Sequence, residues 1–270
     1  MRHGRFLVVA VAFAAMPLRS DPVGGAPPSA EEQAAIVDSM KRYAQQYVST
    51  LPNFLCMQVT EQYKSDKKAE HWKKGETLTS RLAYVDGREK RTLELVNDKP
   101  VRTRTSGWRM PLTTEGEFGE LLDRVFADDS QAAFTWNRWD TLGTKHVAVF
   151  DFSIEKEHST LKLTAGDLAT AIIAYHGSVN ADPKTGAIWR VSDDAVDLPP
   201  ELRTYEIGTT VEYESIAIGG NSYVLPVHAS VLCRTFDGSM RNEIYFRNYR
   251  KFEAESTLKY ETPGDDPQAR

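Results

Sequence analysis

The chain has 270 residues, 41% of them hydrophobic, so it can bury a substantial core as one large domain or two smaller ones without a partner. Its 38 Asp and Glu residues outnumber its 33 Lys and Arg residues and give a formal net charge of −5. Because nucleic-acid-binding proteins normally carry a basic surface, this charge argues against a nucleic-acid partner.

The first residues have the pattern of a secretory signal peptide. Arg2 and Arg5 precede an apolar run over residues 6–15, and polarity rises sharply after Leu18. The run is shorter than the roughly 20 apolar residues of a membrane-spanning helix, and no later stretch approaches that length. We therefore predict a signal peptide at 1–19, with an uncleaved N-terminal anchor as the alternative. The mature chain is then expected to be periplasmic or secreted, without a transmembrane span.

The rest of the chain divides into three parts by composition. Residues 20–28 are rich in Pro and Gly, which predicts a flexible lead. Residues 29–260 carry periodic apolar segments separated by turns, and we expect them to form a single domain. Residues 261–270 turn to Pro, Gly, Asp and Gln, which predicts a disordered tail.

Two amphipathic helices are expected. Ser29 and Glu32 form a capping box, and the helix that follows should end before Pro52 and lay an apolar stripe on a sheet. This stripe consists of Val37, Met40, Ala44, Tyr47, Val48 and Leu51. A second possible capping box, at Thr114 and Glu117, precedes a shorter helical pattern made by Phe118, Leu121, Leu122, Val125 and Phe126.

Most of the remaining chain alternates between apolar and polar residues, as half-buried strands do. The Asp-Gly and Gly-Gly-Asn turns between these segments supply the positive φ that tight hairpins need. Apart from the first helix, no helix is long enough for a crossover, which disfavours a parallel sheet. The predicted hairpins are 76–84 with 88–96, 133–139 with 145–155, and 171–181 with 187–191, beside a strand at 54–63 and a meander of 209–218, 222–234 and 240–250.

Three features of the second half point to a known fold. They are the turn from Asp182 to Gly186, Trp189 on the strand that leaves this turn, and the closing strands from Val211 to Phe252. In these features the chain resembles the LolA-like superfamily, which includes periplasmic carriers of outer-membrane lipoproteins and envelope-stress regulators. The resemblance implies an α+β fold in which a strongly curved antiparallel β-sheet, a half-barrel, wraps the N-terminal amphipathic helix. It also implies a concave apolar face that accepts acyl chains or a protein partner.

Aromatic residues are the candidates for ligand contact. The chain has five Trp, eleven Tyr and eleven Phe, and many fall in predicted strands. One interpretation is ordinary core packing against the first helix. The other is a cleft between sheet and helix that is apolar enough for a lipid tail. The ligand-binding candidates on the second interpretation are Trp136, Phe150, Phe152, Tyr175, Trp189, Tyr213, Tyr223 and Phe246.

The sequence contains no motif that indicates catalysis. A nucleophile elbow, a His-Glu-x-x-His pair, a P-loop and a dinucleotide fingerprint are all missing. Asp193 and Asp194 are adjacent, so on a strand they point to opposite faces, which weakens a paired-carboxylate site. From the missing motifs we expect neither an enzyme nor a cofactor. We expect no metal site either, because the histidines on predicted strands stand singly: His146, His158, His176 and His228.

Cys56 and Cys233 could form a disulfide after export. Such a bridge would close a very long loop and contribute on the order of 4–5 kcal/mol in the chain-entropy model. In strand alternation Cys233 lies with the apolar face of its strand, whereas Cys56 lies on the face opposite the apolar residues Leu55, Met57 and Val59. Two separate, partly buried thiols are the alternative.

Three functions remain open. The first is an exported soluble envelope protein that binds a lipid, an acyl chain or a lipoprotein on the concave apolar face of its sheet. The second is a protein-binding sensor or regulatory module on the same scaffold, with an envelope protein as its partner. The least favoured is a hydrolase with a dispersed site.

Overall fold

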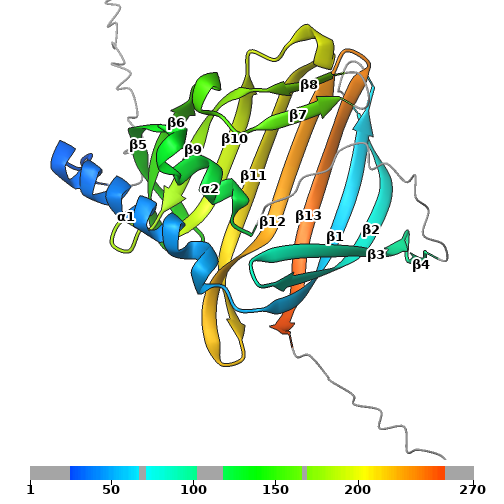
Figure 1. Ribbon diagram of the computed structural model, residues 1–270, viewed down its shortest axis with the longest axis horizontal. Coiled ribbons are helices and arrows are strands. Elements are labelled where there is room, and N and C mark those ends of the chain that lie inside the picture. The colour runs from blue at the N-terminus through cyan, green and yellow to red at the C-terminus, as the bar shows by residue number, and fades with distance from the viewer. Residues whose placement is uncertain (1–24, 67–70, 102–117, 166–168, 253–270) are drawn as a thin grey trace, which may run out of the picture.

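The computed structural model describes residues 25–66, 71–101, 118–165 and 169–252. Two α-helices, three short 3-10 helices and thirteen strands lie in these ranges (Figure 1). The helices are α1 (Ala30–Thr50), α2 (Glu120–Phe126), η1 (Asp128–Ser130), η2 (Lys156–His158) and η3 (Pro200–Leu202). The strands are β1 (Phe54–Ser65), β2 (Trp72–Val85), β3 (Arg88–Val96), β4 (Lys99–Pro100), β5 (Ala133–Leu142), β6 (Lys145–Ile154), β7 (Lys162–Ala165), β8 (Ala169–Ile172), β9 (Ala174–Ala181), β10 (Ile188–Val196), β11 (Thr204–Ile218), β12 (Asn221–Thr235) and β13 (Gly238–Lys251).

Eleven of the strands form one antiparallel sheet in the order β4-β3-β2-β1-β13-β12-β11-β10-β9-β6-β5. The sheet bends around α1 and α2, which both lie on the same side of it (Figure 1). We call this side the concave face and the opposite side the convex face. The predicted fold class, α+β with a curved antiparallel sheet around an N-terminal helix, is confirmed.

Helix α1 begins at the predicted capping box. The Ser29 hydroxyl accepts a hydrogen bond from the Glu32 backbone N–H at 3.2 Å, and the Glu32 carboxylate accepts one from the Ser29 N–H at 2.7 Å. The residues of α1 that are buried against the sheet are Ile36, Met40, Ala44 and Tyr47. Val48, which was predicted to belong to this stripe, is 41% exposed and lies at its margin.

The predicted turn at Asp182 to Gly186 forms and packs directly against α1. The Asp182 carboxylate accepts hydrogen bonds from the N–H groups of Lys184 and Thr185, and Gly186 has a φ of +73°. A Cβ atom added to Gly186 would lie 2.3 Å from the backbone carbonyl of Ser39 in α1. This turn therefore fixes the position of the helix over the sheet.

Helix α2 has the predicted apolar residues but a different start. Thr114 and Glu117, the second predicted capping box, lie outside the described residues, and α2 begins at Glu120 with Gly119 as its N-cap. No side chain caps this end. A Cβ atom on Gly119 would come within 2.4 Å of the Val48 side chain, so the glycine allows α2 to approach the end of α1 closely.

The predicted strand at 171–181 is divided in two. Strand β8 pairs with β7 in a separate two-stranded sheet, and β9 joins the main sheet. Between them Ile173 is buried, and its N–H donates to the Leu161 carbonyl at 3.0 Å. A contact from outside the strand thus interrupts an otherwise continuous β pattern.

Strand β1 presents the opposite face from the one that its apolar residues suggested. Phe54 and Cys56 point into the core, and Gln58, Thr60 and Gln62 follow them on the same face with 4–5% exposure. Leu55, Met57 and Val59 consequently lie on the convex face, where Met57 is 36% exposed. The aromatic side chain of Phe54 decides the orientation, because it stacks on Tyr84 inside the core.

The predicted signal peptide at 1–19 and the predicted tail at 261–270 lie outside the described residues. Part of the predicted lead at 20–28 is described, and it contacts the sheet where the Trp139 indole N–H donates to the Ala26 carbonyl at 3.0 Å. None of the helices within the described ranges combines the length and the hydrophobicity that crossing a membrane requires.

Candidate functional site

The concave face has an apolar floor made of small side chains. Val191, Val211, Ala229 and Ile244 are register partners on the adjacent strands β10 to β13, and each is at most 3% exposed. Neighbouring side chains on one face of such strands lie about 5 Å apart, so this row is continuous. Helix α1 lies over the floor and is tied to it by the Tyr47 hydroxyl, which donates to the Val224 carbonyl at 2.9 Å.

An aromatic cluster closes the floor beneath the C-terminal end of α1. Phe54 and Tyr84 stack with ring centroids 5.1 Å apart, and Phe118 packs on Phe54 at 5.3 Å. Phe118 also meets Phe246 edge to face at 5.2 Å. Because Phe118 lies just before α2, this cluster joins the beginning of α2 to the β1–β2 side of the sheet.

A second aromatic cluster lies at the other side of the sheet, on β5, β6 and β9. Phe126 of α2 stacks on Phe134 at 5.3 Å, and Phe152 meets Tyr175 edge to face at 6.1 Å. The Tyr175 hydroxyl donates to the Arg124 carbonyl in α2 at 3.0 Å. Aromatic clusters therefore lie at both sides of the concave face, and α2 is in contact with both of them.

Two pockets open at the two ends of α1. The first, which we call the Val48 pocket, has a volume of about 380 Å³ and is lined by Val48, Tyr84, Gly87, Glu89, Arg91, Phe118 and Glu120. The second, the Phe150 pocket, has about 370 Å³ and is lined by Ala30, Gln33, Ala34, Val37, Asp38, Lys41, Ala132, Phe134 and Phe150. Each pocket has at least one aromatic side chain from the sheet and an apolar side chain from α1.

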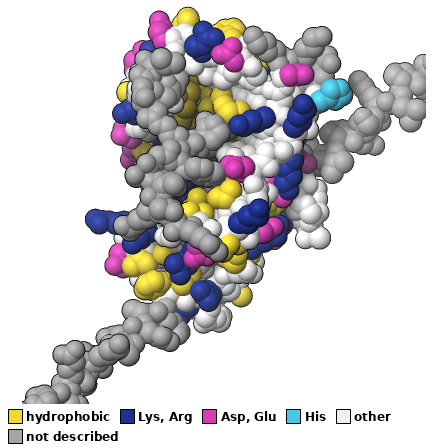
Figure 2. Space-filling model, turned by 90° about the vertical axis from the view of Figure 1, so that its right-hand side faces the viewer, with side chains coloured by type: hydrophobic (Ala, Val, Ile, Leu, Met, Phe, Trp, Pro, Cys, Tyr) yellow, Lys and Arg dark blue, Asp and Glu magenta, His cyan; other side chains and the backbone are white. Residues whose placement is uncertain are grey.

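The side of the molecule next to β1–β3 is seen in Figure 2. Hydrophobic side chains gather in groups on this side, and Lys, Arg, Asp and Glu side chains stand around them.

The structure separates the eight predicted ligand-binding residues into two groups. Seven of them belong to the concave core or pack against it: Trp136, Phe150, Phe152, Tyr175, Tyr213, Tyr223 and Phe246. Of these, Phe150 lines the Phe150 pocket. Trp189 is the exception, because the Lys145 ammonium lies 4.6 Å from its ring centroid, at a third pocket of about 200 Å³ beside the β5–β6 turn.

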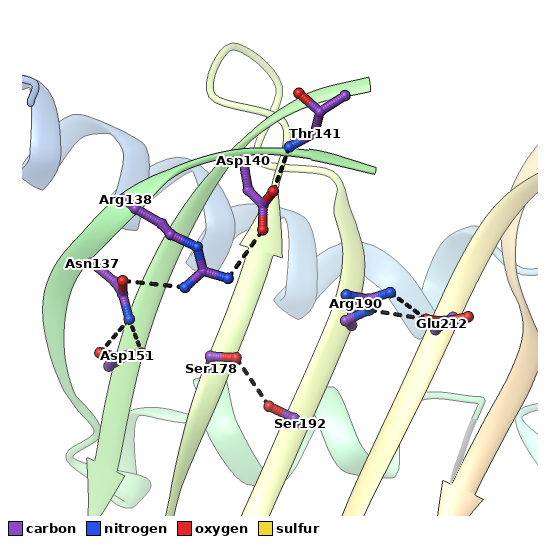
Figure 3. Close-up of polar contacts among 9 residues, drawn as sticks. All are labelled: Asn137, Arg138, Asp140, Thr141, Asp151, Ser178, Arg190, Ser192 and Glu212. Atoms are coloured by element: carbon purple, nitrogen blue, oxygen red, sulfur yellow. Dashed lines mark hydrogen bonds and ion pairs between the residues drawn. The ribbon is translucent and has the colours of Figure 1, made fainter. Parts of the chain in front are cut away.

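Residues near the third pocket belong to a polar convex face. Arg190 donates from Nε to Glu212 at 3.0 Å, and the hydroxyls of Ser178 and Ser192 lie 3.0 Å apart (Figure 3). In Figure 3 these side chains stand on the side of the sheet away from α1. This face is solvated in the way that is usual for an antiparallel sheet with one buried face.

One carboxyl group is buried beneath α2. Asp193 is 5% exposed, and its carboxylate lies 3.7 Å from the guanidinium of Arg124. Burial raises the pKa of Asp193 to about 6, although Arg124 and a hydrogen bond with Thr209 oppose the increase. Asp193 and Asp194 point to opposite faces, as predicted, so they form no carboxylate pair for acid–base chemistry.

The possible disulfide between Cys56 and Cys233 is not formed, and both thiols are free and buried. Strand β13 lies between the strands of the two cysteines. Cys233 pairs with Met240 near the start of β13, whereas Cys56 lies next to the part of β13 between Arg247 and Arg250. That separation is roughly 23 Å along the strand, far more than the roughly 7 Å between Cα atoms that a disulfide tolerates. Burial raises the pKa of Cys56 to about 12, which makes its thiol unreactive.

Within the described ranges, no cluster of three or more His, Cys, Asp and Glu side chains is placed to hold a metal ion. The His146 ring stacks on Trp139 at 4.8 Å. His228 lies between two carboxylates of the convex face, 2.9 Å from Glu243 and 3.5 Å from Glu212. His146 and His228 thus lie in separate surroundings.

Sequence patterns did not single out the residues of the Val48 pocket. Val48 was assigned to the buried stripe of α1, Phe118 to the core of a short helix, and Tyr84 to a hairpin strand. These residues come from three separate elements, so only the packing of α1, α2 and the β2–β3 hairpin brings them together. No local sequence signal marks them, because the exposure of Val48 follows from the way these elements pack.

No protein-family model matches the chain, and no curated protein matches it. Among solved structures, it is similar to a LolA superfamily protein from Nitrosomonas europaea, with a TM-score of 0.43 and 8% identity over 81% of this chain and 94% of that one. It is also similar to a putative outer membrane lipoprotein-sorting protein domain from Vibrio parahaemolyticus, with a TM-score of 0.39 and 9% identity over 83% and 94%. A DUF1329 family protein from Desulfovibrio piger gives a TM-score of 0.39 and 11% identity over 81% and 92%. The resemblance predicted from the sequence is found again among solved structures, as a distant LolA-like similarity of fold.

Proposed function

We propose that this protein binds the acyl chain of a lipid or a lipoprotein between α1 and the concave face of its sheet. The observation that carries this proposal is the pair of pockets at the two ends of α1, each with aromatic and aliphatic walls. Their volumes fall in the lower part of the range of about 300–1,000 Å³ that is usual for small-molecule sites. The protein is on this view a binding protein and not an enzyme.

The Val48 pocket is the entrance that we favour. Val48 is an aliphatic side chain of α1 that remains 41% exposed, and Phe118 presents an aromatic ring to the same space. A buried methylene gains about 0.8 kcal/mol, so a few carbon atoms inserted beside these residues would already give useful affinity. Glu89, Arg91 and Glu120 border the pocket, where a polar head group of the ligand would remain in water.

The proposed location follows from the same chemistry. A signal peptide at 1–19 would send the chain to the periplasm or out of the cell, where lipids and lipoproteins require carriers that cover their acyl chains. A protein-binding role on the same scaffold is the alternative. Crosslinking that recovers one dominant envelope protein, together with an absence of acyl binding, would favour that role.

The pocket assignment can be tested by filling each pocket separately. Val48→Trp places a large side chain in the Val48 pocket, and Ala34→Trp does the same in the Phe150 pocket. We expect Val48→Trp to weaken the binding of a fluorescent long-chain fatty acid at least tenfold, roughly 1.4 kcal/mol, because the ligand loses its space. Ala34→Trp should have a smaller effect.

The matched control is Gln45→Trp, which adds the same side chain to an exposed position of the same helix. This variant should bind the probe as the unmodified protein does. Equal binding by Val48→Trp and Gln45→Trp would contradict the Val48 pocket as the entrance. If the unmodified protein takes up no acyl probe after delipidation, the proposed function itself is wrong.

A further inference from the structure

The convex face has two halves of different character. On β10 to β13 several of its charged side chains have partners of opposite charge. Arg190 contacts Glu212, and Glu243 contacts both Arg241, at 3.0 Å, and His228. Such matched charges are expected on a solvated sheet face.

The half on β13, β1, β2 and β3 is basic and partly apolar. The register places Arg250, Leu55, Ala83 and Lys90 side by side across four strands. The next row on the same face contains Arg247, Met57, Arg81 and Thr92. Arg88 follows at the end of the β2–β3 hairpin, opposite Val85. We call the surface formed by Arg81, Arg88, Lys90, Arg247 and Arg250 around Leu55 and Met57 the convex basic patch.

The cations of this patch are largely unmatched. Arg81 pairs with Glu94 at 3.2 Å, and Arg247 lies over the Tyr245 ring at 5.1 Å. In the described part of the chain no ion pair joins Arg88, Lys90 or Arg250, and all three are exposed. Glu94, Asp86 and Glu61 are the carboxylates next to the patch, and Glu61 already pairs with Lys74 at 2.8 Å, so the five cations leave the patch positive on a chain whose net charge is −5. This local charge is opposite in sign to that of the whole molecule.

The centre of the patch is more apolar than is expected for a strand face that only contacts water. Leu55, Met57 and Val59 alternate along β1 on the convex face, while the polar Gln58, Thr60 and Gln62 occupy the buried face. A strand whose convex face had only to be solvated would carry the opposite pattern. The orientation of β1 therefore places aliphatic and thioether side chains at the surface within a ring of Arg and Lys.

We propose that the convex basic patch docks on the surface of an anionic lipid bilayer. Its Arg and Lys side chains would contact the phosphate groups of the lipids, and Leu55 and Met57 would enter the interfacial layer between the head groups. Guanidinium and ammonium groups around a small apolar centre provide the two attractions on which peripheral membrane binding depends. The opposite face of the same β2–β3 hairpin supplies Tyr84, Glu89 and Arg91 to the Val48 pocket, so docking brings this pocket close to the membrane.

Cosedimentation of the full chain with vesicles tests this proposal. Vesicles of phosphatidylcholine with 30% phosphatidylglycerol should bind the protein, and vesicles of phosphatidylcholine alone should bind it much more weakly. The triple variant Lys90→Gln, Arg247→Gln, Arg250→Gln should lower the partition coefficient on the anionic vesicles roughly 100-fold, because each basic side chain near such a surface contributes substantially. Met57→Ser should lower it several-fold, and 0.5 M salt should weaken binding by the unmodified protein.

The matched control removes three positive charges elsewhere. Lys156→Gln, Lys162→Gln, Lys184→Gln changes the net charge equally at exposed positions outside the patch, and it should bind the anionic vesicles within about threefold of the unmodified protein. Equal losses in the two triple variants would show a net-charge effect and overturn the assignment of the patch. Binding that shows no preference for anionic vesicles would also overturn the proposal. Binding to an acidic protein without any binding to anionic vesicles would overturn it as well. These outcomes leave the acyl site untouched, since its test uses a soluble fatty acid and different residues.

Discussion

At the residue scale, Asp193 makes the stability of the fold depend on pH. Its pKa is raised by burial from 3.8 to about 6, so the folded protein binds this proton more tightly than the unfolded chain does. The stabilisation by the protonated carboxyl is complete below pH 3.8 and is lost as the pH rises through about 6. Above that pH a charged carboxylate is buried beneath α2 with Arg124 as its ionic partner at 3.7 Å.

The variant Asp193→Asn tests this dependence. Asn cannot ionise, so the free energy of unfolding of the variant relative to the unmodified protein should increase by about 2 kcal/mol between pH 4.5 and pH 7.5. Urea unfolding at the two pH values measures the difference, and the loss of the Arg124 contact affects both measurements. A difference that does not change with pH would show that Asp193 is not protonated near pH 6 in the folded protein.

At the scale of elements, the position of α1 depends on the turn at Asp182 to Gly186. Gly186→Ala combines a positive φ of +73° with a Cβ atom 2.3 Å from the Ser39 backbone, so the turn and the helix must separate. Gly220→Ala is the control, because its φ is +86° and no atom lies within 4 Å of the added Cβ. We expect Gly186→Ala to destabilise the protein by at least about 1–2 kcal/mol more than Gly220→Ala in thermal or urea unfolding. Equal losses would mean that only backbone strain matters and that the turn does not hold α1.

Hairpins and caps were predictable because their determinants are local. The turns at Asp86-Gly87 and Gly219-Gly220 form with positive φ as predicted, and the Ser29–Glu32 capping box starts α1. The β7–β8 pair and the break at Ile173 were missed because a distant backbone group, the Leu161 carbonyl, creates them. Sequence alternation is therefore sufficient for strands that pair with their neighbours and insufficient where another segment intervenes.

The candidate site was only partly predictable. Seven of the eight aromatic candidates do lie in the concave core or pack against it, because strand alternation sorts side chains by face. Trp189 lies elsewhere, since a bulge between Ile188 and Arg190 alters the register there. On β1 the apolar residues Leu55, Met57 and Val59 suggest one buried face, but the packing of Phe54 on Tyr84 turns the other face inward.

At the scale of the whole molecule, the sheet separates two surfaces with different chemistry. The concave face holds the apolar floor, both aromatic clusters and the pockets at the two ends of α1. The convex face is polar and charge-matched on one half and basic on the other. The β2–β3 hairpin contributes to both surfaces, and the proposed acyl site and the proposed membrane contact thus lie on opposite sides of one structural element.

The central claim is that the space between α1 and the concave face receives an acyl chain. Native mass spectrometry of the full chain purified from a bacterial envelope measures this directly. We expect a bound mass that corresponds to a lipid or fatty acid, which is lost on delipidation, regained with added fatty acid, and reduced in Val48→Trp but retained in Gln45→Trp. A protein that carries only its own mass, and takes up no fatty acid after delipidation, would contradict the account.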